Sequence, residues 1–250
     1  MDKVYVTDTG KVREHNEDDG GIFTNEAGDY LAVVADGMGG HQAGDVASSM
    51  TVNLLRSFWE PIQHSFSVEE AKHWLEEQIR QVNQYVYDQA ASDQKMAGMG
   101  TTIVAAVCMR SYMVIAHVGD SRAYQISEHE LNLITEDHSL VNELKQSGQL
   151  TEEEAKDHPR KNVLMRAVGT EPDVNIETVS LQWQIGDGLL LCSDGLTNKL
   201  EAEKIHEHLQ APGSLHERAL SLIHTAKERG GEDNITLAVI LQSSLEKEVE

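Results

Sequence analysis

Short apolar segments rich in β-forming residues recur along this chain and predict buried β-strands. Each segment is brief and is bounded by polar or turn-forming residues. The densest ones are Tyr30–Ala35, Thr102–Met109, Tyr112–Val118, Gly188–Cys192 and Ile235–Leu241. We expect each of them to form a strand in the protein interior.

Three further segments space their apolar residues by three and four positions, which is typical of amphipathic helices. The first covers Ala43–Trp59, the second Val68–Val86 and the third Leu215–Ala226. Gly230-Gly231 follows the third segment and favours a left-handed helix end. The pattern predicts two long helices after early strands and one helix before the last strand.

The order of these segments predicts an α+β fold with antiparallel sheet. Predicted strands follow one another across brief turns such as Arg110-Ser111, and the helices come in pairs, so a regular βαβ alternation is not expected. We expect one domain over residues 1–242 and a frayed tail over 243–250. Residues 137–168 are polar and only weakly helical, and we interpret them as an inserted flap.

Composition narrows the range of partners and compartments. The 250 residues include 20 Lys and Arg against 42 Asp and Glu, a net charge of −22, which disfavours nucleic acid as a partner. No apolar run reaches the roughly 20 residues that span a bilayer, so no membrane insertion is expected. Met1–Thr9 lack the apolar segment of a secretory signal, and Cys108 and Cys192 lie in apolar runs as expected of reduced thiols. We therefore predict a cytoplasmic protein, and we expect a monomer.

Acidic residues recur at the ends of the predicted strands. Asp36, Asp120 and Asp194 each follow a strand directly or closely, and Asp233 precedes the last one. Neighbouring ends of antiparallel strands share a sheet edge, so these carboxylates can converge. Such a cluster is tolerable only if protons or cations neutralise it, and all-oxygen ligands suit Mg²⁺ or Mn²⁺. The alternative for any single site is that Asp-Gly is ordinary turn chemistry.

A motif near the N-terminus adds a basic residue to this pattern. Arg13 precedes the acidic pair Glu17-Asp18 by four residues. The planar guanidinium of arginine suits phosphate oxygens, whereas the alternative is a salt bridge within a surface loop.

Taken in order, the motifs resemble those of the metal-dependent PP2C-type (PPM) protein Ser/Thr phosphatases in their compact bacterial form. They are Arg13-x-x-Asn16-Glu17-Asp18, Asp36-Gly37-Met38-Gly39-Gly40-His41, Gly100-Thr101-Thr102, Gly119-Asp120-Ser121-Arg122, Ser193-Asp194-Gly195 and Asp233-Asn234. The resemblance extends from about Thr7 to Leu241. It implies a four-layer αββα sandwich, with two antiparallel sheets flanked by helix pairs and a binuclear Mn²⁺ or Mg²⁺ centre at one end.

The resemblance also implies a role for each acid at the two tight metal positions. Asp36 is similar to the carboxylate that bridges both metals, and the carbonyl of Gly37 to a ligand of one of them. Asp194 and Asp233 resemble the acids that complete the first site. The acids of the second site, which act partly through water, have their counterparts in Glu17 and Asp18.

Two further residues gain expected roles from the same resemblance. Asp120 is similar to the acid that, together with Asp194, recruits a third and weaker metal in bacterial members. Arg13 resembles the phosphate clamp.

The implied reaction is attack of a metal-bridging hydroxide on phosphoserine or phosphothreonine, without a protein nucleophile. Many eukaryotic members have a histidine directly after the metal-binding Asp-Gly as a candidate proton donor, but Met38 stands there in this chain. His41 is a candidate for that proton transfer, and metal-bound water is the alternative.

The expected partners are phosphorylated proteins, including a membrane-anchored Ser/Thr kinase and its substrates. Two other functions stay open from sequence, a catalytically silent scaffold of the same fold and a divalent-ion-binding signalling protein. The scaffold is disfavoured because all the expected metal acids are present, and no EF-hand loop supports the ion-binding alternative.

Overall fold

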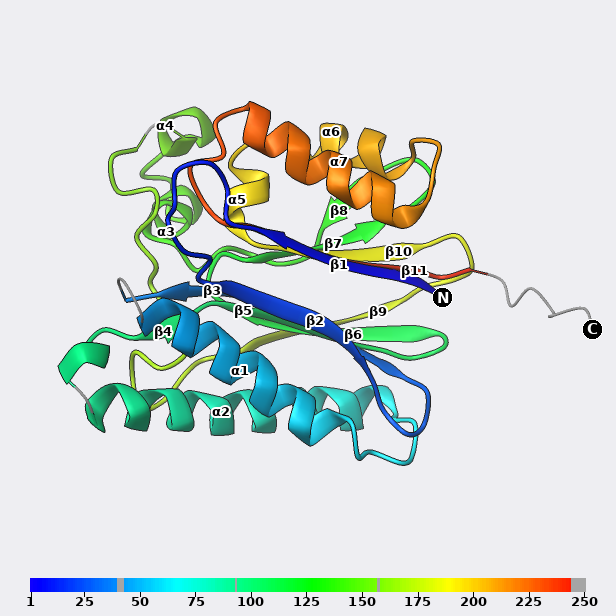
Figure 1. The fold of residues 1–250 in the computed structure, drawn as a ribbon, viewed down its shortest axis with the longest axis horizontal. Coiled ribbons are helices and arrows are strands. Elements are labelled where there is room, and N and C mark those ends of the chain that lie inside the picture. Colours follow the sequence, from blue (N-terminus) through cyan, green and yellow to red (C-terminus); the bar gives the residue numbers. More distant parts are fainter. Residues whose placement is uncertain (40–42, 93, 157, 244–250) are drawn as a thin grey trace, which may run out of the picture.

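Two antiparallel sheets lie face to face between two layers of helices in the computed structural model (Figure 1). The structure describes residues 1–39, 43–92, 94–156 and 158–243. The four-layer αββα arrangement confirms the predicted fold class.

The first sheet has five strands in the order β1 (Asp2–Asp8), β11 (Ile235–Leu241), β10 (Gly188–Cys192), β7 (Arg122–Ile126) and β8 (Leu131–Leu133). The second has the order β2 (Asp18–Thr24), β3 (Tyr30–Met38), β5 (Ile103–Cys108), β6 (Tyr112–Val118) and β9 (Glu177–Gln182), and β4 (Gly100–Thr101) also pairs with β3. The five strands predicted from apolar runs are therefore confirmed.

Helices cover the outer face of each sheet (Figure 1). The second sheet packs against α1 (Ala43–Trp59) and α2 (Val68–Ser92), and the 3₁₀ turn Gln94–Met96 follows them. The first sheet packs against α5 (Asp194–Thr197), α6 (Ala202–Leu209) and α7 (Leu215–Glu228). The predicted helices are confirmed, and Gly230 and Gly231 after α7 both have positive φ values.

Burial on both faces explains why the central strands are apolar without interruption. In β3, Leu31 and Val33 pack toward α1 and α2, whereas Ala32 and Val34 pack toward the other sheet. The layer between the sheets also contains Leu189 of β10. Strands that bury both faces lose the alternation of polar and apolar residues that marks a half-exposed strand.

The segment 137–168 forms the short helices α3 (Leu140–Gln146) and α4 (Glu152–Lys156) at one end of the sandwich (Figure 1). Its two ends are joined at the base, where Leu140 N donates to Val163 O at 2.9 Å and Met165 N donates to His138 O at 2.8 Å. This arrangement suits the flap that the sequence predicts. Of the predicted tail, residues 244–250 lie outside the described part of the chain.

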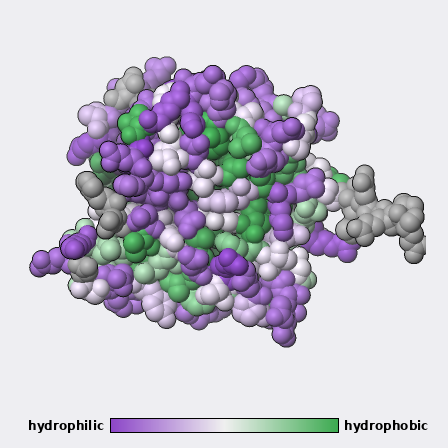
Figure 2. Space-filling model, viewed as in Figure 1, coloured by the Kyte–Doolittle hydropathy of each residue, from purple (hydrophilic) through white to green (hydrophobic). Residues whose placement is uncertain are grey.

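Hydrophilic residues predominate on the face of the molecule shown in Figure 2. In the described part of the chain, none of the helices combines the length and the apolar character needed to cross a membrane.

Candidate metal centre

The acids singled out from the sequence meet at one end of the two sheets. Asp36 on β3 lies opposite Asp18 on β2 in the strand register, and Asp194 begins α5 directly after β10. The pKa of Asp36 is raised well above its ordinary value, first by burial and then by neighbouring carboxylates. Those neighbours are Asp18, Asp194, Asp120 and Asp233. The predicted convergence of the strand-end aspartates is therefore present.

Other members of the cluster also hold protons more tightly than usual. Burial, followed by nearby carboxylates, raises the pKa of Asp18 and of Asp120 to about 7 and that of Asp194 to about 6. Like charges in a partly dehydrated site disfavour the ionised form. At neutral pH the cluster therefore needs bound protons or cations to neutralise its negative charge.

Backbone contacts fix Asp36 and leave its side chain available. Asp36 N donates to Thr102 Oγ1 at 3.0 Å, and Asp36 O accepts from Thr102 N at 2.8 Å and from Thr101 Oγ1 at 2.9 Å. The residue after Asp36 must be glycine, because a Cβ on Gly37 would lie 2.1 Å from the carbonyl oxygen of Gly44. The Gly-Thr-Thr motif thus positions the end of β3.

Asp18 offers a direct test of whether the site suits a cation. Ser193 Oγ donates to Asp18 Oδ2 at 2.7 Å, and Thr236 N donates to Ser193 Oγ at 3.0 Å. The other carboxylate oxygen, Asp18 Oδ1, is buried and has no hydrogen-bond partner among the described residues. An orphaned buried carboxylate oxygen beside other carboxylates fits a hard divalent ion such as Mn²⁺ or Mg²⁺.

Glu17 is held by its main chain beside the start of α1. Glu17 N donates to Asn234 Oδ1 at 2.8 Å, and Glu17 O accepts from Ser48 Oγ at 2.6 Å. The carboxyl group reaches toward Gly44, where a Cβ would lie 2.9 Å from the Glu17 carboxyl carbon. Glu17 is thus at the same end of the molecule as Asp18.

Arg13 contacts an acid of the cluster directly. Its NH2 group donates to Asp233 Oδ2 at 2.9 Å, and 48% of the Arg13 side chain is exposed. The loop that carries Arg13 is anchored, because Lys11 N donates to Gly231 O at 2.7 Å and Asn234 Nδ2 donates to His15 O at 3.0 Å. The exposed guanidinium therefore lies at the edge of the cluster in a defined position.

Asp120 lies in the turn after β6 and faces a cavity of about 330 Å³ beside the flap. Asp194 lines the same cavity. Arg122, which lines the same cavity, makes a two-bond ion pair with Asp137 at 2.8 and 2.6 Å.

Sequence reasoning assigned no role to the residues that position these acids. Ser193, Asn234 and Thr102 hold Asp18, Glu17 and Asp36 respectively. The available signal was their place inside the motifs Ser-Asp-Gly, Asp-Asn and Gly-Thr-Thr.

The family profile of protein phosphatase 2C matches residues 10–225. The chain belongs to the protein phosphatase 2C family. The serine/threonine phosphatase stp of Listeria monocytogenes serovar 1/2a is 45% identical over 247 residues, which cover 99% of this chain and 98% of that protein.

Solved structures of phosphatase 2C relatives share the fold. The serine/threonine phosphatase Stp1 from Staphylococcus aureus has a TM-score of 0.93 and 37% identity, with 98% of this chain and 96% of that chain covered. The catalytic domain of the protein phosphatase PstP, described in complex with two manganese ions, has a TM-score of 0.82 and 33% identity, with 95% and 96% covered.

Two kinds of residue bear on the chemistry of this family member, the candidate proton donor His41 and the two cysteines. His41, the candidate proton donor, lies outside the described residues, so its role stays a prediction. Cys108 and Cys192 are free and buried, and burial raises the pKa of the Cys192 thiol to about 12. A buried thiol that resists ionisation is unsuited to nucleophilic catalysis.

We expect the metal-free protein to lose stability as the pH rises from about 4 to about 7. Asp18, Asp120 and Asp194 have folded-state pKa values raised to about 6 or 7, so the folded state binds more protons than the unfolded chain in this window. Thermal unfolding in EDTA across this range measures the decline, and saturating Mn²⁺ should reduce it.

Asp18→Asn should flatten this pH dependence. Asp19→Asn is the matched variant, because it removes an equal charge from the next position of β2. A melting temperature in EDTA that stays constant or rises between pH 4.5 and 7 would contradict the expectation.

Proposed function

We propose that this chain is a metal-dependent phosphatase that hydrolyses phosphoserine and phosphothreonine in proteins. The observation that supports this most strongly is the cluster of carboxylates with raised pKa values around Asp36, with one orphaned oxygen on Asp18. Its relatives include serine/threonine phosphatases from Listeria and Staphylococcus.

Mn²⁺ or Mg²⁺ is the cofactor in this proposal. Asp36 would contribute to both metal positions, and the Gly37 carbonyl to one of them. Asp194 and Asp233 would complete the first position, and Glu17 and Asp18 would hold the second, partly through water. When bound, the ions acidify a water for attack on phosphorus and neutralise charge on the phosphoryl oxygens. The PstP relative was described with two manganese ions.

Arg13 is proposed to bind the phosphoryl group. Its guanidinium is half exposed at the edge of the carboxylate cluster, and its planar fork suits two phosphate oxygens. The contact with Asp233 orients the guanidinium before substrate arrives.

The cavity beside Asp120 is the proposed site for substrate residues that flank the phosphorylated one. The flap contributes Asn142, Lys145 and Lys161 to its lining. The same lining includes Asp137 and Glu152 of the flap, and Lys145 lies 3.9 Å from Glu152. Lys145 and Lys161 are the flap cations that would meet an anionic substrate in a protein whose net charge is −22.

We also propose that the substrates include a membrane-anchored Ser/Thr kinase and the proteins that it phosphorylates, and that the enzyme acts in the cytoplasm as a monomer. Resemblance to the compact bacterial form supports the kinase partner. Two buried free thiols are in keeping with a reducing compartment.

Hydrolysis of phosphoserine and phosphothreonine peptides in Mn²⁺ and in EDTA tests the function. Phosphate release that requires the ion supports the enzyme. Absence of turnover with Mn²⁺ bound would favour the scaffold or the ion-binding protein instead.

Arg13→Ala should raise KM for phosphopeptides by about tenfold, the loss expected for a charge-assisted hydrogen bond to phosphate of about 1.5 kcal/mol. Both tight metals should stay bound, since the proposed partner of Arg13 in catalysis is phosphate. Steady-state kinetics and calorimetric metal stoichiometry measure the two effects.

Lys11→Ala is the control for Arg13→Ala, because it removes one positive charge from the same loop. We expect Arg13→Lys to restore KM only in part, since lysine lacks the planar fork. A lost tight metal in Arg13→Ala would show that the arginine is structural.

A further inference from the structure

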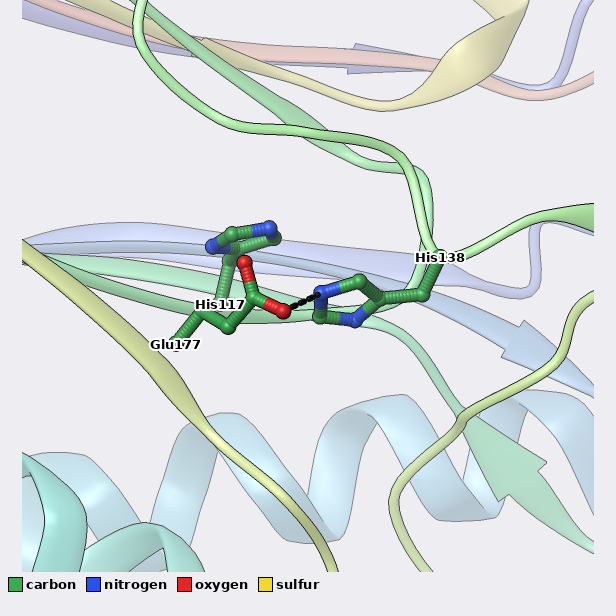
Figure 3. Close-up of side chains that lie close together, drawn as sticks. All are labelled: His117, His138 and Glu177. Atoms are coloured by element: carbon green, nitrogen blue, oxygen red, sulfur yellow. Dashed lines mark ion pairs between the residues drawn. The ribbon is translucent and has the colours of Figure 1, made fainter. Parts of the chain in front are cut away.

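A second cluster of polar side chains lies next to the metal centre and has no role in the mechanism above. It contains His117 of β6, Glu177 of β9 and His138, which precedes α3 (Figure 3). Both histidines are buried, and the nitrogen and oxygen atoms that could bind an ion lie within 4.8 Å of one another. His138 Nε2 lies 3.1 Å from Glu177 Oε1.

The geometry of this cluster is poorly suited to a metal ion. The two imidazole rings stack with centroids 4.6 Å apart and planes 22° apart, so their lone pairs lie in nearly parallel planes, which disfavours convergence on one ion. Arg166 already supplies a cation, because its NH1 group donates to Glu177 Oε1 at 2.8 Å. The hydrogen bonds of His138 point to a different role.

His138 holds Gly119 with two hydrogen bonds. His138 N donates to Gly119 O at 2.9 Å, and Gly119 N donates to His138 Nδ1 at 3.1 Å. Burial, then the charge of His117, lowers the pKa of His138 to about 4, so the ring carries one proton at neutral pH. Because Nδ1 accepts from Gly119, that proton lies on Nε2, which is 3.1 Å from Glu177 Oε1 and 3.4 Å from Arg166 NH1.

The peptide that His138 holds comes directly before Asp120. Gly119 has φ of 109°, and a Cβ there would lie 2.6 Å from Thr102 Cγ2, so the turn tolerates little displacement. Thr102 Oγ1 accepts from Asp36 N at 3.0 Å and is hydrogen-bonded to Ser121 Oγ at 2.7 Å. The turn that carries Asp120 is thus connected to β3 on one side and to His138 on the other.

His138 also belongs to the base of the flap. Its carbonyl accepts from Met165 N at 2.8 Å, and the next residue, Ser139, forms a bridge with Leu164. Arg166 binds Glu177 beside the ring of His138. A displacement of the flap base would therefore move the group that holds Gly119.

We propose that His138 is a positioning residue that ties the flap to the Gly119–Asp120 turn and so sets the place of the Asp120 carboxylate at the metal centre. This rests on the proposed function, together with the role that the resemblance gives to Asp120, which is to support a third and weaker metal. Flap and metal centre then respond together when a substrate occupies the cavity between them.

Two conservative substitutions separate this role from simple packing. His138→Asn keeps an acceptor at the position of Nδ1 but loses the reach to Glu177, whereas His138→Gln reaches Glu177 and loses the acceptor for Gly119. We expect His138→Gln to lower kcat for phosphopeptides by about tenfold, as for other residues that orient metal ligands. His138→Asn should stay close to the wild type, and both should keep two tight metals and similar KM.

His117→Gln is the control, since it alters the same buried stack without a hydrogen bond to Gly119. It should lower the melting temperature and leave kcat per folded molecule unchanged. Equal kcat in all variants, or a larger loss in His138→Asn than in His138→Gln, would overturn the positioning role.

Stoichiometric Zn²⁺ binding that both His117→Gln and His138→Asn abolish would replace the positioning role with a metal site. Inactive wild-type protein in Mn²⁺ would overturn the proposed function as well, so the two failures are distinguishable.

Discussion

Asp36→Asn should reduce kcat/KM for phosphopeptides on the order of 1,000-fold while the protein stays folded. This corresponds to about 4 kcal/mol of transition-state stabilisation, a loss in keeping with removal of the carboxylate shared by two cations. The Asn side chain has nearly the same shape, and the bonds that hold this position to Thr102 come from the main chain. Phosphopeptide kinetics at moderate Mn²⁺ measure the effect.

The stability of the same variant distinguishes lost chemistry from lost folding. Asp36 is repelled by neighbouring carboxylates, so Asp36→Asn should melt in EDTA at or above the wild-type temperature. Mn²⁺ should raise the melting temperature of the wild type more than that of the variant. Asp19→Asn is the control for charge and should retain activity. Full activity of Asp36→Asn at moderate Mn²⁺ would refute the assigned role.

The sequence predicts the interior strands well and the edge strands poorly, for a physical reason. The predicted strands β3, β5, β6, β10 and β11 are interior strands, and most of their residues are buried. The edge strands β1, β2, β8 and β9 were not predicted. The interior strand β7 was missed as well, because Arg122 and Gln125 interrupt its five residues. Edge strands carry more polar side chains because one side meets solvent, so they lack a dense apolar run. In β2 the run is also broken by Asp18, Asp19, Gly20 and Gly21.

The positions of the acids follow from strand ends, whereas their supports depend on distant contacts. Asp36 and Asp194 could be placed because each follows a predictable strand. The contact between Arg13 and Asp233 joins residues 220 positions apart, and no local pattern encodes it. The pairing of His138 with Gly119 could not be predicted from the sequence either, because a single histidine in a polar segment forms no recognisable pattern.

The short helices that pack against the first sheet show a second limit of prediction from the sequence. Helix α5 has four residues and α6 has eight, too few to establish the periodicity that identified α1 and α2. The consequence for the site is that Asp194, which was predicted only to follow a strand, also begins a helix. Its carboxylate accepts from Asn198 Nδ2 at 3.0 Å, one turn further along.

Asp120→Asn should lower kcat for phosphopeptides by roughly 10- to 100-fold, about 1.4 to 2.8 kcal/mol, and leave two tight metals bound. Asp120 lies at the cavity beside the flap, and burial followed by the charge of Asp194 raises its pKa to about 7. A carboxylate in that setting would support a third, weakly held cation near the leaving group, yet it is not needed for the pair at Asp36.

Asp194→Asn provides the contrast, because Asp194 is expected to serve both the tight pair and the third ion. That variant should lose metal affinity as well as activity.

The competing explanation is that Asp120 only stabilises the turn after β6. Asp137→Asn tests this directly, since Asp137 holds Arg122 in the same turn through two hydrogen bonds but is not an expected ligand. If the turn alone matters, Asp137→Asn and Asp120→Asn should both lower the melting temperature and spare kcat per folded molecule. If the third cation matters, Asp120→Asn should lose kcat at nearly unchanged stability, and measuring metal stoichiometry, melting temperature and kcat on one preparation decides between them.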